Sequence, residues 1–78
     1  MLKFKLIENN DLYISYEYLP EGRKPGGLIT MNKKNTDDIK KELALEDEFG
    51  SYACHMMSKM RKFIKEENYE ETGMIARY

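Results

Sequence analysis

Residues 48–67 read EFGSYACHMMSKMRKFIKEE, and this stretch decides the fold. Its apolar residues recur at intervals of three and four, which places them along one face of an α-helix. Acidic residues at 46–48 and basic residues near the far end suit the dipole of such a helix, and Asn68 is its expected end. The predicted apolar stripe consists of Ala53, Met56, Met57, Met60, Phe63 and Ile64.

An amphipathic helix must bury its stripe against another layer, and the residues before it supply a sheet. Residues 2–8 alternate apolar and polar side chains, as a half-buried strand does. Residues 12–18 alternate in the same way, and a turn at 9–11 joins the two segments as a β-hairpin. One face of the second strand is predicted to hold Leu12, Ile14, Tyr16 and Tyr18, and the other face Tyr13, Ser15 and Glu17.

Three further segments add to the predicted sheet. Residues 19–27 form a loop rich in glycine and proline, and residues 28–32 form a third strand. Residues 38–45 fit both a helical spacing and a strand alternation; we expect a strand, with a helix as the alternative. Residues 73–78 are expected to form a last strand.

Together these elements predict an α+β fold in a single domain, 1–78. An antiparallel sheet of three to four strands occupies residues 2–45. One long amphipathic helix at 48–67 packs on one face of that sheet, and a C-terminal strand follows. A chain of 78 residues is too short for two independent cores.

The composition limits the class of protein and the compartment in which we expect it. A chain that is 41% hydrophobic and 35% charged is too apolar for a disordered protein and too polar for a membrane protein. Residues 1–7 do not resemble a signal peptide, and one cysteine cannot form an internal disulfide, so we expect a cytoplasmic protein without membrane contacts. The composition resembles that of short Lys-, Asn- and Ile-rich proteins of low-GC bacteria and their phages, a likeness that transfers no functional residue.

Cys54 and His55 are the only cysteine and the only histidine in the chain. Adjacent side chains on a helix point in different directions, so these two do not form a nucleophile and its base. A structural zinc site needs four nitrogen or sulfur ligands, and the acids at 46–48 lack the spacing of a calcium loop. We therefore expect no catalytic residue, no metal site and no cofactor.

Arg23 and Lys24 lie in the glycine-rich loop and are a weak candidate for an anion site. A phosphate-binding loop continues from its lysine into Ser or Thr and then a helix, whereas Lys24 precedes Pro25 and a strand. We favour a solvated connection between strands, with anion binding as the alternative. The net charge of −1 also disfavours nucleic acid as a partner.

Six tyrosines are more than a chain of this size can bury, and tyrosine is common at interfaces. Tyr13, Tyr16 and Tyr18 are the candidate interface residues, with a core position as the alternative for Tyr16 and Tyr18. The sequence thus favours a small non-enzymatic binding or regulatory protein that acts through protein–protein contacts, as a homodimer or with a small protein partner. The alternative is a small enzyme, or an enzyme subunit whose site is completed at a subunit interface.

Overall fold

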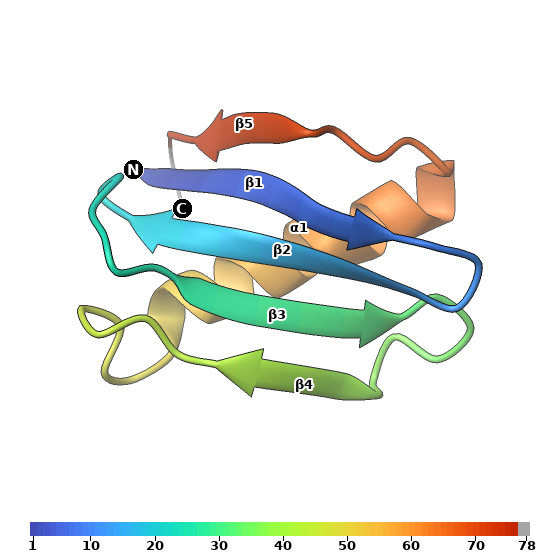
Figure 1. Cartoon of the computed structure of the whole chain (residues 1–78), viewed down its shortest axis with the longest axis horizontal. Coiled ribbons are helices and arrows are strands. Elements are labelled where there is room, and N and C mark those ends of the chain that lie inside the picture. Colours follow the sequence, from blue (N-terminus) through green and yellow to red (C-terminus); the bar gives the residue numbers. More distant parts are fainter. Residues whose placement is uncertain (77–78) are drawn as a thin grey trace.

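The protein folds as a five-stranded antiparallel sheet with one helix packed on it, as shown by a computed structural model that describes residues 1–76. The strands are β1 (Leu2–Asn9), β2 (Tyr13–Pro20), β3 (Gly27–Asn32), β4 (Ile39–Glu42) and β5 (Thr72–Ile75), and the helix is α1 (Ser51–Glu66). Their order in the sheet is β4-β3-β2-β1-β5, so the first strand of the chain lies between β2 and β5 (Figure 1). The α+β architecture predicted from the sequence is confirmed.

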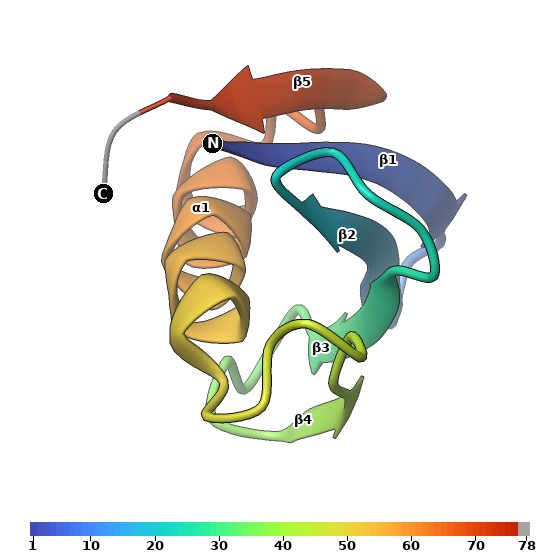
Figure 2. The same ribbon diagram turned by 90° about the vertical axis from the view of Figure 1, so that its left-hand side faces the viewer.

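The sheet has one covered face and one open face. Figure 1 looks onto the face that carries no helix, and α1 crosses behind the strands. Figure 2 shows the sheet from its side, curved around the helix. We call the face that packs against α1 the covered face and the opposite one the open face.

The predicted strands are present, but their ends differ from the predicted limits. The first three strands begin and end within two residues of their predicted limits. The segment predicted at 38–45 is a strand, but only Ile39–Glu42 pairs with β3, and the chain then leaves the sheet. The final strand begins at Thr72, and residues 77–78 of its predicted span lie outside the described part of the chain.

Leu12 does not extend the buried face of the second strand, as the alternation had suggested. The side-chain oxygen of Asn10 accepts hydrogen bonds from the amides of Leu12 and Tyr13, at 2.8 and 2.9 Å. This bonding holds Leu12 in the turn, where its side chain is 65% exposed. The prediction for Leu12 was therefore wrong, whereas Ile14, Tyr16 and Tyr18 are buried as expected.

The core lies between the covered face and the helix stripe. Five of the six predicted stripe residues are buried, and Ile64 is partly buried against them. At the centre, the ring of Tyr16 packs edge-on to Phe4 with centroids 5.6 Å apart, and it contacts Phe63 at 5.5 Å. Such aromatic contacts add to the stabilisation that burial of apolar area provides.

The helix begins later than predicted because Asp47 caps it from outside. The helix starts at Ser51, and no acidic residue lies in its first turn. Asp47, only 3% exposed, accepts hydrogen bonds from the amides of Tyr52 and Ala53, at 3.1 and 2.9 Å. A carboxylate at this position satisfies amides that lack helical partners and interacts well with the helix dipole.

Two tyrosines of β2 connect the sheet to both ends of the helix. The Tyr18 hydroxyl donates to Asp47 at 2.9 Å and accepts the Ala44 amide at 2.9 Å. The Tyr16 hydroxyl donates to the Glu70 carbonyl at 2.6 Å, beyond the other end of α1. Both buried phenols therefore have polar partners, as buried hydroxyls require.

Candidate functional site

The open face contains a hollow of about 630 Å³ near the β1–β2 turn. Its apolar lining comes from Ile7, Leu12 and Leu28, with the half-buried ring of Tyr13 beside them. Strand alternation accounts for Tyr13 and Leu28, because the next residues along their strands, Ile14 and Ile29, are buried on the covered face. The hollow is thus partly built by the residues that the core leaves out. Its polar lining comes from Glu8, Ser15, Thr30, Asn32, Asp38 and Lys40.

A β-bulge in β1 shapes this end of the sheet. Leu6 pairs with Tyr16 in regular register, but the next pair joins Glu8 to Ser15, so Ile7 is an extra residue. Without the bulge, Ile7 would lie across from Ser15. The bulge instead places the Glu8 carboxylate on the open face and leaves the Ile7 side chain 53% exposed beside it.

Two hydroxyl groups contribute to the lining of the hollow. Ser15 and Thr30 face each other across β2 and β3, and their oxygens are 2.7 Å apart in a hydrogen bond. Ser15 is almost completely buried by its neighbours on the face. Because the two hydroxyls bond to each other, a molecule covering them needs to replace few hydrogen bonds to water.

The structure separates the three candidate tyrosines. Tyr13 lies in the hollow on the open face, whereas Tyr16 and Tyr18 are fully buried on the covered face. Burial raises the pKa of the Tyr16 hydroxyl to about 12, and the nearby Glu70 and Tyr69 add to the rise. Burial also raises the pKa of Tyr18 to about 12; the Ala44 amide opposes this rise, and Asp47 adds to it. Of the three, Tyr13 is the ring that a partner can reach.

Arg23 and Lys24 are exposed in the loop between β2 and β3. The Arg23 guanidinium lies 3.6 Å from the Glu46 carboxylate, which offsets part of its charge. The structure does not bring these two residues to the hollow, and the anion-binding role of the loop stays a prediction.

Cys54 is exposed, and His55 is half-buried, both on α1. Neither belongs to the buried set of the helix, in agreement with the predicted stripe. Across residues 1–76, no three histidine, cysteine or acidic side chains lie close enough together to hold a metal ion.

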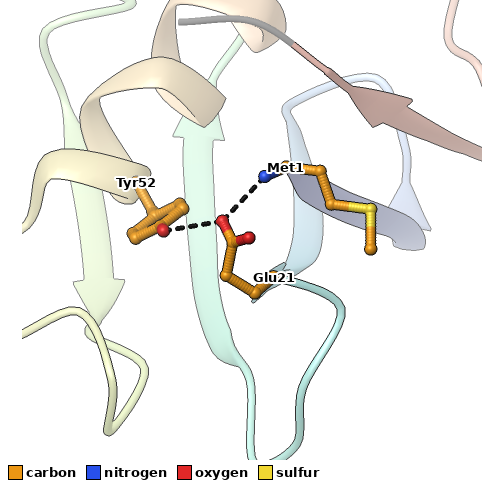
Figure 3. Close-up of polar contacts among 3 residues, drawn as sticks. All are labelled: Met1, Glu21 and Tyr52. Carbon is orange, nitrogen blue, oxygen red and sulfur yellow. Dashed lines mark hydrogen bonds and ion pairs between the residues drawn. The ribbon is translucent and has the colours of Figure 1, made fainter.

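Glu21 holds two parts of the molecule together, and the sequence did not point to it. Its carboxylate accepts hydrogen bonds from the Met1 ammonium at 2.7 Å and from the Tyr52 hydroxyl at 2.8 Å (Figure 3). Glu21 and Gly22 both have positive φ, 53° and 73°, in the turn that follows β2. This turn directs the carboxylate towards the helix, and the contact is an exposed one of modest strength.

A second group of exposed apolar side chains lies in the loop between β4 and α1. Leu45 is 79% exposed and Phe49 is 90% exposed, with Leu43 close to them in sequence. The loop itself is held by Ala44 and Asp47, whose side chains are buried between these exposed positions. The loop lies outside the hollow and contributes none of its lining.

Comparison with protein-family models, with curated proteins and with solved structures finds no match to this chain. None of the helical structure in residues 1–76 is long and apolar enough to cross a membrane.

Proposed function

We propose that this protein is a small non-enzymatic binding protein of the cytoplasm, and that the open face of its sheet is the surface that contacts a protein partner. The observation that carries the proposal is the hollow of about 630 Å³, lined by partly exposed aliphatic side chains on a face that no helix covers. Exposed apolar side chains grouped on one face are typical of interaction surfaces.

The layout of the open face supports a protein partner. Leu28 lies on β3, an inner strand of the sheet, and charged residues on β1, β2 and β4 lie around it. An apolar centre with a charged rim is the arrangement found in protein–protein interfaces. A hydroxyl pair that is already hydrogen-bonded, Ser15 with Thr30, can be covered at low cost.

Photo-crosslinking in the cell of origin tests this proposal. A photoreactive amino acid is placed at Leu28 or at Thr30 on the open face, and at Lys65 on the exposed side of α1 as the control. We expect the same protein to be crosslinked from both open-face positions and not from Lys65, with its identity established by mass spectrometry. Crosslinks that are equally abundant from Lys65, or none from the open face, would contradict the proposal.

A further inference from the structure

The open face carries two parallel rows of side chains whose ends have opposite charges. The first row crosses four strands as Lys5, Glu17, Leu28 and Glu42. The second row lies two residues away on β2, β3 and β4 and, because of the bulge, three residues away on β1; it contains Glu8, Ser15, Thr30 and Lys40. The first row therefore runs from a base to an acid, and the second from an acid to a base.

The four end residues form a rectangle of alternating charge. Lys5, Glu8, Lys40 and Glu42 are all exposed. Strand spacing makes the rectangle about 14 Å by 7 Å. No ion pair within residues 1–76 uses any of the four, and Glu8 accepts one hydrogen bond, from Asn10.

Alternating corners make this face complementary to itself. If a second copy packs face to face about a two-fold axis parallel to the strands, the axis exchanges the two ends of each row. Lys5 then lies over Glu42 of the second copy, and Glu8 lies over Lys40. An axis across the strands exchanges the two rows instead, and it places Lys5 over Glu8 and Glu42 over Lys40. Either symmetry brings only opposite charges together at the corners.

We propose that the partner of the open face is a second copy of this chain, packed sheet to sheet in a two-fold dimer. The inference rests on the proposed function and names the partner that the charges favour. The strands of this face carry three bases, Lys3, Lys5 and Lys40, and three acids, Glu8, Glu17 and Glu42. A balanced, alternating surface of this kind suits a copy of itself better than a strongly basic or a strongly acidic partner.

The side chains between the corners fit a packed interface. In the row with Lys5, Leu28 lies over the side chain of Glu17 of the second copy for an axis along the strands, and over Thr30 for an axis across them. Glu17 has the opposite charge of Lys5 as its cross-strand neighbour. In the other row, Ser15 and Thr30 bond to each other. Two sheets packed face to face lie about 10 Å apart, a gap that lysine and glutamate side chains from opposite sheets can span.

Sedimentation equilibrium of the full chain, from about 1 µM to about 1 mM, measures the dimer directly. We expect dimers for the natural sequence and a dissociation constant at least about tenfold higher for Leu28→Glu, which buries a carboxylate in the interface and, for an axis along the strands, sets it over Glu17 of the second copy. The control Lys65→Glu, on the exposed side of α1, should stay within about twofold of the natural sequence. A monomer throughout this range, or a dimer that Leu28→Glu does not weaken, would overturn the inference.

Charge-reversal variants test whether the four corner residues meet their opposite charges across the dimer. Lys5→Glu should raise the dissociation constant about tenfold, because each dimer gains two like-charge contacts. Adding Glu42→Lys should restore the dimer if the axis runs along the strands. Adding Glu8→Lys should restore it if the axis runs across them. A dimer that neither second change restores does not use these corners, and the inference fails.

The two proposals fail in different ways. A monomeric protein whose open-face positions still crosslink to a different protein would overturn the dimer and leave the binding function standing. A dimer with no crosslinks from Leu28 or Thr30 would use another surface, and both proposals would fall.

Discussion

The two faces of the sheet place the same residue type, tyrosine on β2, in different environments. On the covered face, β2 contributes Tyr16 and Tyr18, whose rings are buried and whose hydroxyls bond to fixed partners. On the open face it contributes Tyr13, whose ring remains half-buried at the edge of a hollow. Position within the alternation, and not residue type, therefore decides whether a tyrosine stabilises the fold or is available to a partner.

The largest contrast between the faces is expected from placing an aspartate on each. Met60→Asp buries an unpaired charge against the covered face and should unfold the protein, because the loss of more than about 4 kcal/mol approaches the whole stability of so small a domain. Leu28→Asp on the open face should remain folded. Circular dichroism and urea denaturation measure both. A folded Met60→Asp variant of unchanged stability would show that the helix stripe is assigned wrongly.

High pH should weaken the covered face selectively. The pKa values of Tyr16 and Tyr18 are raised to about 12 from an unfolded value near 10, so the folded state favours the neutral phenols. Their contribution is complete below about pH 10 and is lost between about pH 10 and pH 12, a decrease of several kcal/mol in the free energy of unfolding. Thermal unfolding, together with phenolate absorbance, follows this loss. If both rings ionise at about pH 10, the value for an exposed tyrosine, and the protein stays folded, the burial of their hydroxyls is disproved.

Removing one tyrosine hydroxyl should lower the stability more on the covered face than on the open face. Tyr18→Phe leaves the buried amide of Ala44 without its acceptor and Asp47 without one donor, and it should destabilise the protein by about 2 kcal/mol. Tyr13→Phe, the matched change on the open face, should alter stability by less than about 0.5 kcal/mol. Urea denaturation of both variants gives the difference, and equal effects would argue against the contrast between the faces.

The smallest expected effect is a gain in stability from a substitution at the C-terminal end of α1. Glu67 has a left-handed conformation with φ 52°, and the amides of Glu67 and Asn68 bond to Ile64 and Phe63 as in a Schellman motif. Glu67→Gly removes the strain of this conformation and should stabilise the protein by about 0.5–1 kcal/mol. Glu66→Gly, one residue earlier and still helical, should destabilise it by about 1 kcal/mol. Thermal unfolding of both variants checks this: the melting temperature should rise for Glu67→Gly and fall for Glu66→Gly.

The sequence was sufficient for elements with a clear period. Alternation located β1, β2 and β3, and the three- and four-residue spacing located α1, because both periods record which side chains are buried. It was less accurate at Leu12, where the turn is set by hydrogen bonds to the Asn10 side chain. It could not fix the extent of β4, since residues 43–45 continue the alternation after the strand has ended.

Features that depend on distant contacts were not predictable from local patterns. The hydrogen bond from the Tyr18 hydroxyl to Asp47, at the start of the helix, joins residues that are 29 positions apart. The hollow depends on the bulge at Ile7, which no local pattern of residues indicated. The alternating corners of the open face appear only once the register of four strands is known, because the register decides which charges share a row.

The place of β1 between β2 and β5 has a consequence for synthesis on the ribosome. β1 can pair with β2 as soon as the hairpin emerges, but its other edge has no partner until residues 72–75 are made and pair with Leu2–Lys5. Until then, one edge of the sheet exposes unpaired backbone groups, which is the situation in which nascent chains aggregate. Completion of the sheet must therefore follow translation of nearly the whole sequence shown, and the closing step joins segments about 70 residues apart.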